Sequence, residues 1–341
     1  MAKPEKLASN QFDHIYKGGY KIGALRNGPG GPMRPEEWIG SMTTRFGEKT
    51  MGLTTLSDGT TLRDSVLKDP ESWLGAEHLS TFGPSSELLV KLLDPDQRLP
   101  VHYHPNRAFA KKHLSLQHGK TEAWIILEAP AGANVGLGFS QEQTKKDIAA
   151  MVEARDSQGL IDSLQKFDVK AGDAILVPSG VPHAIGAGIF VMELQEPTDL
   201  SALLEWNDFA VDGTVDGHLG LGFDTVLDAL RYSPIEKSEA ATLVTNNRLA
   251  EGANTSIFTG AADPYFRADY LGSASPRVDA GFGIFLVLQG AGSISFDNAS
   301  EMAIEKGDAV LIPASAGSWK VSGAQGILAR PPLAQFAAQA I

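Results

Sequence analysis

Short apolar runs separated by turn residues recur along most of this chain. Gly and Pro, the main turn residues, occupy 36 and 19 of the 341 positions. Runs punctuated in this way are typical of many short strands joined by turns. We therefore predict a mainly β fold. The predicted strands are Glu87–Asp94, Glu122–Ala129, Asp173–Ser179, Gly188–Gln195, Gly283–Gly290, Ala309–Ser315 and Gly326–Pro332.

Four other segments have apolar residues at helical spacing, which predicts helices between the strands. The longest of them, residues 141–167, is expected to form a helical insertion. The other predicted helices are residues 61–75, with a break at Pro70, residues 107–116 and residues 221–232.

One motif occurs twice along the chain. Gly172–Pro178 reads GDAILVP, and Gly307–Pro313 reads GDAVLIP. A similar apolar run precedes each copy, so the repeat predicts two domains of the same architecture. We place the boundary between them in the polar stretch 233–256. The expected domains are therefore residues 1–245, which carry the helical insertion at about 141–167, and residues 246–341.

Three histidines and one glutamate suggest a metal site. His102 and His104 are two positions apart, so both imidazoles lie on one face if this segment is a strand. Glu122 begins the next apolar run, and His183 follows a third run. Three imidazoles and one carboxylate form a complete set of ligands for a divalent transition metal.

The segment from Gly172 to His183 reads G-x5-P-x-G-x2-H, which resembles the second metal-binding motif of the cupin β-barrels. The resemblance implies two cupin-like barrels of the jelly-roll type. In the second copy, Ser318 stands where the first has His183, and no histidine follows His218. The second barrel is therefore expected to bind no metal.

Longer segments resemble the type I mannose-6-phosphate isomerases. The resemblance implies a metal-dependent aldose–ketose isomerase that interconverts mannose 6-phosphate and fructose 6-phosphate. It also implies one Zn²⁺ per chain, although Fe, Mn, Co and Ni suit the same ligands. The segments are residues 88–113 around VHYHPN, residues 119–129 (GKTEAWIILEA), residues 177–199 around VPSGVPHAIG, and residues 217–232.

The resemblance places Lys120 and Glu193 in proton transfer. Strand alternation supports both positions, because Lys120 precedes Glu122 by two residues and Glu193 shares a face with Val191. An isomerase needs such acid–base groups to move a proton between C1 and C2 of the sugar. The residues expected to contact the substrate are Lys91, Asp199 and Arg107.

Two positions depart from the family's pattern. The family usually has Gln where this chain has His102, and an imidazole binds zinc at least as well. The family also has an arginine where this chain has Leu203, a change that removes up to five hydrogen-bond donors. Either another cation replaces that arginine or the substrate has no phosphate. The available cations are Arg45, Arg107, Arg231 and Lys112.

Composition narrows the class of partner. The net charge of 29 − 41 = −12 argues against nucleic acid and anionic membranes. Cysteine is absent, and neither a secretory signal nor an apolar run of about 18 residues is visible. We expect a cytoplasmic protein, monomeric or homodimeric, that acts on a small sugar or sugar phosphate. The remaining histidines are expected on the surface or in loops (His14, His78, His113, His118) or at a helix end (His218).

Three other functions stay open at this point. The chain could be an isomerase or epimerase of a different, unphosphorylated sugar, or a non-catalytic sugar-binding cupin, and Leu203 keeps both alternatives open. It could also be a cupin dioxygenase, since three His and one Glu hold Fe(II) or Ni(II) as well. Lys120 and Glu193 favour isomerase chemistry over oxygen chemistry.

Overall fold

Two antiparallel sheets form a barrel in the N-terminal part of the chain. The computed structural model describes residues 1–250 and 254–340. The larger sheet is β13 (Val244–Thr245), β9 (Ala174–Val177), β6 (Glu122–Glu128), β11 (Phe190–Gln195), β4 (Leu89–Leu93), β3 (Glu36–Ile39) and β2 (Gln11–Phe12), in that order. The smaller sheet is β12 (Ala202–Leu203), β5 (His102–Tyr103), β10 (His183–Ile185), β7 (Asn134–Phe139) and β8 (Leu164–Asp168).

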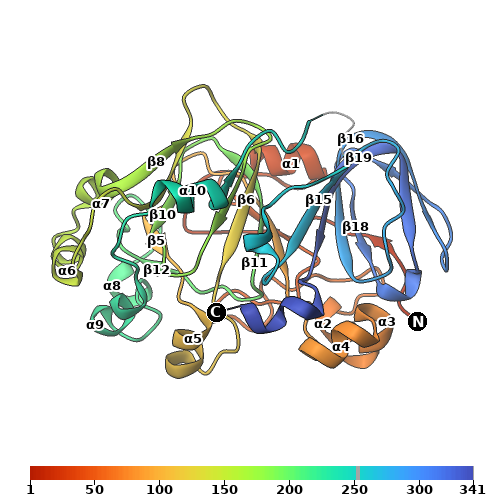
Figure 1. The fold of residues 1–341 in the computed structure, drawn as a ribbon, viewed down its shortest axis with the longest axis horizontal. Helices are drawn as coiled ribbons and strands as arrows, with labels where there is room; N and C mark the ends of the chain where they lie inside the picture. Colours follow the sequence, from red (N-terminus) through yellow and green to blue (C-terminus); the bar gives the residue numbers. More distant parts are fainter. Residues whose placement is uncertain (251–253, 341) are drawn as a thin grey trace.

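A third antiparallel sheet forms most of the C-terminal part, drawn in blue in Figure 1. Its first strand comes from the other end of the chain, because Glu5 pairs with Leu311. The order is β1 (Glu5–Lys6), β18 (Ala309–Ile312), β16 (Gly283–Phe296), β19 (Trp319–Arg330), β15 (Arg267–Leu271) and β14 (Thr255–Ser256), and β17 (Met302–Glu305) also pairs with β16.

Short helices cover the outside of the sheets. The helices α6 to α9 flank the N-terminal barrel, and α2 to α4 lie against the C-terminal part (Figure 1). Within the described chain, no helix is long and apolar enough to cross a membrane. The helices are α1 (Tyr20–Arg26), α2 (Leu62–Lys68), α3 (Pro70–Leu74), α4 (Ala76–Phe82), α5 (Arg107–Leu114), α6 (Lys145–Ala154), α7 (Ser157–Ser163), α8 (Gly213–Asp216), α9 (Phe223–Val226) and α10 (Lys237–Leu243), with 3₁₀ turns at Leu227–Ala229, Gly260–Ala262, Ala314–Ala316 and Ala334–Gln339.

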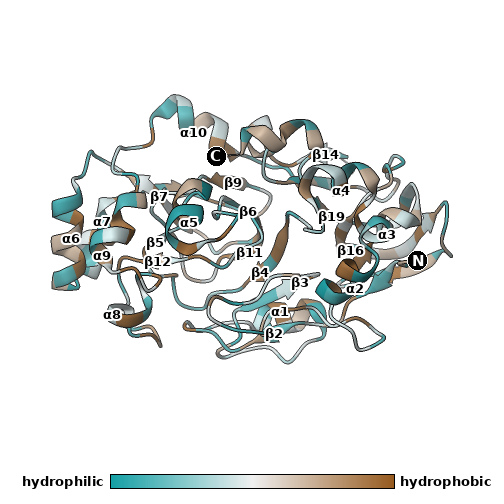
Figure 2. Cartoon of the chain, turned by 90° about the horizontal axis from the view of Figure 1, so that it is seen from below, coloured by the Kyte–Doolittle hydropathy of each residue, from teal (hydrophilic) through white to brown (hydrophobic). Residues whose placement is uncertain are grey.

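One hydrophobic core joins the two parts of the molecule. It includes Val90 and Ile125 of the N-terminal barrel together with Ile284 and Leu311 of the C-terminal sheet, all of them buried. Inner strands such as β16 are strongly apolar, whereas α2 and α5 carry many polar residues (Figure 2). Burial of these apolar strand faces is the main free-energy gain that holds the two parts together.

The structure confirms most of the predicted elements, since each predicted strand overlaps an observed one, although β16 and β19 are longer than expected. The predicted helix 61–75 breaks as expected, because α2 ends at Lys68 and α3 begins at Pro70. The helical prediction is wrong over Leu164–Asp168, which forms the strand β8. Burial alternates from Gln165 to Asp168, with Gln165 and Phe167 half-buried and Lys166 and Asp168 exposed, which suits a strand beside β7.

The predicted helix over residues 221–232 is shorter than expected. It splits into α9 and a 3₁₀ turn and ends before Leu230, which is extended. In the predicted boundary region, α10 and β13 precede residues 251–253, which lie outside the described residues. The division of the chain at residue 245 stays a prediction.

Arg26 is a buried connection between the two parts. Its Nε donates to Oε1 of Glu37 at 3.0 Å, and Nη2 donates to the carbonyl of Leu7 at 2.9 Å. Nη1 donates to the carbonyl of Gly307, in the turn before β18. Glu37 is fully buried, so Arg26 is the charge that compensates its carboxylate.

We expect Arg26→Met to lower the free energy of unfolding by about 3–5 kcal/mol, because it leaves a buried carboxylate without its partner. Arg34→Met removes an exposed pair, with Asp13, and should cost less than about 1 kcal/mol. Urea unfolding of the two variants tests this. Equal losses would contradict the role assigned to Arg26.

Candidate active site and metal centre

A cavity of about 540 Å³ lies between the two sheets of the N-terminal barrel. The larger sheet contributes Lys91 and Glu193, and the smaller sheet contributes His102 and Leu203. The loop after β3 and the segment around α8 form the remaining walls. Charged side chains from separate strands therefore converge in one partly enclosed space, as is typical of binding sites.

The smaller sheet brings the three imidazoles together. His102 on β5 is paired with His183 on β10, so their side chains are neighbours on the same face. His104 lies two residues after His102 and points to the same side, whereas Tyr103 packs into the core behind the sheet. Gly180 makes the turn before β10 with φ of +82°, a conformation that favours glycine.

Backbone carbonyls fix the tautomer of each imidazole. In His102, Nδ1 lies 2.8 Å from the carbonyl oxygen of Pro100. In His104, Nδ1 lies 2.6 Å from the carbonyl oxygen of Leu200, and in His183 it lies 2.8 Å from the carbonyl oxygen of Val181. A carbonyl only accepts, so Nδ1 carries the proton and Nε2 keeps a free lone pair. Ligand atoms of the three residues lie within 4.8 Å of one another.

The contacts around the three Nε2 atoms show that these residues fit a cation. Nε2 of His102 lies 3.1 Å from Nε2 of His183. Oxygens of Glu122 lie 2.9 Å from Nε2 of His104 and 3.3 Å from Nε2 of His183. No proton is available between these atoms, so each contact brings two lone pairs together. A divalent metal would turn this repulsion into coordination.

Glu122 and Glu193 come from the larger sheet, and Lys120 comes from the loop just before β6. All three lie beside the imidazoles. Trp124 donates from Nε1 to Oε1 of Glu122 at 2.9 Å and orients that carboxylate. Nζ of Lys120 lies 2.9 Å from Oε2 of Glu122, 3.0 Å from Nε2 of His104 and 3.6 Å from Oε1 of Glu193. The sequence-predicted ligands and proton-transfer residues are therefore neighbours in space.

Burial shifts the pKa values of these groups in opposite directions. Burial lowers the pKa of His104 and of His183 to about 3, so both imidazoles are neutral. Burial and the adjacent Glu122 carboxylate raise the pKa of Glu193 well above its ordinary value. Burial opposes ionisation of Glu122 too, but Lys120 and the imidazoles hold its pKa well below the usual range.

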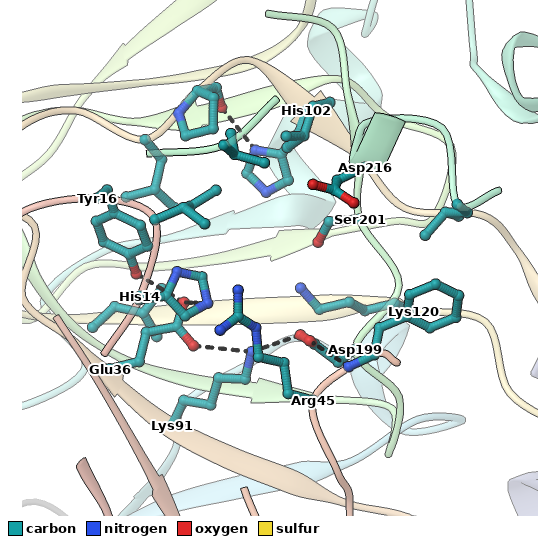
Figure 3. Close-up of a pocket in the computed structure, with 18 of the residues that line it drawn as sticks. His14, Tyr16, Glu36, Arg45, Lys91, His102, Lys120, Asp199, Ser201 and Asp216 are labelled. Carbon is teal, nitrogen blue, oxygen red and sulfur yellow. Dashed lines mark hydrogen bonds and ion pairs between the residues drawn. The ribbon is translucent and has the colours of Figure 1, made fainter. Parts of the chain in front are cut away.

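A second charged cluster lines the larger-sheet side of the cavity (Figure 3). Nζ of Lys91 lies 3.4 Å from Oε2 of Glu36 and 3.5 Å from Oδ1 of Asp199, and it faces the ring of Trp38 at 4.4 Å. Tyr16 and Trp38 each donate a hydrogen bond of 2.9 Å to Glu36. Lys91 and Asp199 thus line the cavity, as expected of substrate-binding residues.

The sequence reasoning missed the N-terminal contribution to this cluster. His14 was expected on the surface or in a loop, but it lines the cavity with its Nε2 3.4 Å from Oε1 of Glu36. Burial lowers its pKa. The segment EEWI of β3 is buried at all four positions, but no sequence pattern indicated that its two acidic residues would be buried.

Other predicted positions lie elsewhere. Arg107 does not line the cavity, because its guanidinium is paired with Glu196 and Glu87 outside it. His218 takes part in a local turn, with its Nδ1 accepting from the N–H of Gly222. Among the described residues, His102, His104 and His183 are the one group of three metal-binding side chains, so no such group lies in the C-terminal sheet.

Two facing sheets that enclose a site of imidazoles and carboxylates, beside a second barrel without one, define a double-barrel protein of the cupin type. The comparisons with known proteins specify the family. The chain is 31% identical over 267 residues to the mannose-6-phosphate isomerase of Streptococcus mutans, which covers 76% of this chain and 80% of the relative. It is 28% identical over 257 residues to mannose-6-phosphate isomerase ManA of Bacillus subtilis, covering 74% and 78%. No family model matches the chain.

Solved structures agree with this result. The mannose 6-phosphate isomerase of Bacillus subtilis superimposes with a TM-score of 0.72 at 21% identity, covering 96% of this chain and 99% of that one. A mannose 6-phosphate isomerase bound with zinc and yttrium gives a TM-score of 0.70 at 15% identity, covering 97% and 100%. The chain therefore belongs to the mannose-6-phosphate isomerase family, a family of sugar-phosphate isomerases. The predicted family and the predicted mainly β fold of two cupin-like barrels are confirmed.

The Glu36 cluster predicts a pH-dependent stability. Burial opposes ionisation of Glu36, but His14 and Lys91 hold its pKa well below the ordinary value of 4.5. A carboxylate with a lowered pKa contributes stability above about pH 4.5 and loses it as the pH falls. We expect Glu36→Gln to lower the free energy of unfolding at pH 7 by about 1.5–3 kcal/mol.

The difference between wild type and Glu36→Gln should shrink below about pH 4.5, because Gln does not titrate and the unfolded wild-type chain takes up the proton. Urea unfolding of both proteins from about pH 7 down to about pH 3.5 measures it. A difference that stays constant over that range would mean that folding does not lower the pKa of Glu36.

Proposed function

We propose that the protein interconverts mannose 6-phosphate and fructose 6-phosphate with one divalent metal, Zn²⁺, held by His102, His104, Glu122 and His183. The convergence of three lone-pair nitrogens and a carboxylate, next to Lys120, is the observation that carries this proposal. All four ligand types are ones that zinc prefers. A relative of the same fold is bound with zinc.

The reaction moves one proton between C1 and C2 of the open-chain sugar. When bound, the metal supplies positive charge that holds the substrate's oxygens and stabilises charge that develops on them. Lys120 and Glu193 form the acid–base pair that removes the proton from one carbon and returns it to the other. Nζ of Lys120 and Oε1 of Glu193 lie 3.6 Å apart, so the charge of one side chain affects the protonation of the other.

Lys91 and Asp199 have a different part in this proposal. Each lines the cavity, and the two are joined at 3.5 Å, so they present a donor and an acceptor at fixed positions. Sugar hydroxyls both donate and accept, which makes such a pair suitable for binding them. We assign these residues to substrate binding and Arg107 to a structural ion pair.

The two barrels are assigned separate roles. We assign the metal ligands and acid–base groups to residues 1–245, and a second barrel to residues 246–341, whose described residues hold no group of three metal-binding side chains. Ser318 holds the position that corresponds to His183, and the C-terminal sheet packs against the N-terminal core instead.

The metal assignment predicts one zinc per chain after reconstitution and dialysis. A His102→Ala/His104→Ala double variant should retain almost none, because two of four ligands are lost. Elemental analysis by mass spectrometry measures the occupancy. His113→Ala, which removes a histidine stacked on Phe109 outside the cluster, serves as the control and should keep full occupancy. Full zinc occupancy in the double variant would refute the assignment.

The zinc-loaded protein should convert mannose 6-phosphate to fructose 6-phosphate, and Glu193→Gln should slow turnover by about 10²–10⁴-fold. Zinc occupancy should not change, because Glu193 is outside the proposed ligand set. Glu128→Gln, at an exposed position of β6, is the matched control. No activity on mannose 6-phosphate, with turnover of unphosphorylated mannose instead, would overturn the proposed substrate. Unchanged turnover by Glu193→Gln would exclude it from proton transfer.

A further inference from the structure

Leu203 leaves one wall of the cavity without a cation. It stands at the position where the family's sequence pattern has an arginine. On β12 it is paired with His102. Its side chain is buried and lines the cavity beside Val211, Val215 and Leu219. Ser201 and Asp216 also line this wall, near His102 in Figure 3. The wall therefore offers a phosphate no positive charge.

Only one of the four other candidate cations reaches the cavity. Arg107 is paired with Glu196 and Glu87, and Arg231 is paired with Glu239. Lys112 is exposed on α5 and does not line the cavity. Arg45 does line it, and Figure 3 shows its side chain across the cavity from His102.

The loop that carries Arg45 is held in place by its backbone. The N–H of Arg45 donates to the carbonyl of Met51 at 2.9 Å, and the N–H of Glu48 donates to the carbonyl of Arg45 at 2.9 Å. The N–H of Phe46 donates to Oδ2 of Asp199 at 3.1 Å, which ties the loop to the cavity wall. Arg45 is thus positioned by contacts that do not involve its guanidinium.

The guanidinium of Arg45 is also available for a ligand. The two lysines that line the cavity already form ion pairs. Lys91 pairs with Glu36 and Asp199. Lys120 pairs with Glu122 and Glu193. No ion pair joins Arg45 to a carboxylate among the described residues, and its recorded side-chain contact is with the sulfur of Met51 at 3.8 Å. Apart from this weak contact of Nη1, the guanidinium donors of Arg45 remain available for a ligand in the cavity.

We propose that Arg45 binds the phosphate of the hexose 6-phosphate and so replaces, from a loop of the opposite wall, the arginine absent at Leu203. This inference rests on the proposed function. Guanidinium groups bind phosphate through two parallel hydrogen bonds, and the partly enclosed cavity strengthens the attraction. An apolar Leu203 is then tolerated, because the anion is held on the other side.

The test compares Arg45→Gln with wild type in two measurements. The first is steady-state kinetics of the zinc-loaded protein on mannose 6-phosphate and on unphosphorylated mannose. The second is calorimetric titration with inorganic phosphate, which needs no turnover. Arg45→Gln should raise KM for mannose 6-phosphate and weaken phosphate binding by about tenfold to a hundredfold, the effect of losing a charge-assisted hydrogen bond. It should leave the kinetics on mannose unchanged within about twofold, which is much less than the effect of one lost hydrogen bond.

Three further variants sharpen the result. Lys112→Gln removes a cation outside the cavity and should behave as wild type. Arg45→Lys should recover part of the phosphate affinity, because it keeps the charge but not the forked geometry. Leu203→Arg in the Arg45→Gln background should restore phosphate binding from the opposite wall.

Two results would overturn the role of Arg45. One is wild-type KM and phosphate affinity in Arg45→Gln, with thermal melting showing a folded protein. The other is an equal loss on mannose and mannose 6-phosphate, which would mean that Arg45 acts on the sugar or on the fold. Failure of the wild-type protein to turn over mannose 6-phosphate would instead count against the proposed function, and the phosphate titration would still decide the role of Arg45.

Discussion

Three hydrogen bonds from imidazole nitrogens to backbone carbonyls determine the chemistry of this protein. They place the proton of His102, His104 and His183 on Nδ1, so that three unprotonated nitrogens converge with the Glu122 carboxylate. The carbonyls belong to the chain segments that carry or flank the site, so the barrel itself dictates the tautomer. Lys120 contacts only His104 and Glu122 of this cluster, and the facing Nε2 atoms of His102 and His183 repel each other unless a metal cation binds between them.

The rest of the cavity depends on the same arrangement of facing sheets. The smaller sheet presents imidazoles, and the larger sheet presents carboxylates and lysines. Glu193 is paired in register with Lys91 on one side and with Trp124 on the other, so acid–base, substrate-binding and ligand-orienting residues occupy adjacent strands. The buried charges compensate one another in pairs, which is the condition under which a folded protein tolerates them.

The strand-borne residues of the cluster can be picked out from the sequence. His102, His104, Glu122 and Glu193 follow the period of two that a strand imposes, and that period holds whatever the surrounding fold. The sequence did not predict His14 or Glu36 at the site and named Arg45 only as one of four candidate cations, because all three reach the cavity through long-range contacts of short strands and loops. Their neighbours in sequence show no alternation that marks a buried site.

Arg107 shows the opposite error. It lies close to the ligands in sequence, but its helix α5 turns the guanidinium toward Glu196 and Glu87. The strand β8 was mistaken for helix because it directly follows α7 and is only five residues long. Both errors have the same cause. A local sequence pattern does not show which segments that are distant in sequence pack together.

The most direct test of the central claim is a crystal structure of the zinc-loaded protein, with anomalous diffraction data collected at the zinc absorption edge. The claim predicts one strong anomalous peak per chain, about 2.0–2.1 Å from Nε2 of each of the three histidines and at a similar distance from an oxygen of Glu122. A peak at another place in the chain, or an imidazole turned so that Nδ1 faces the metal, would contradict it.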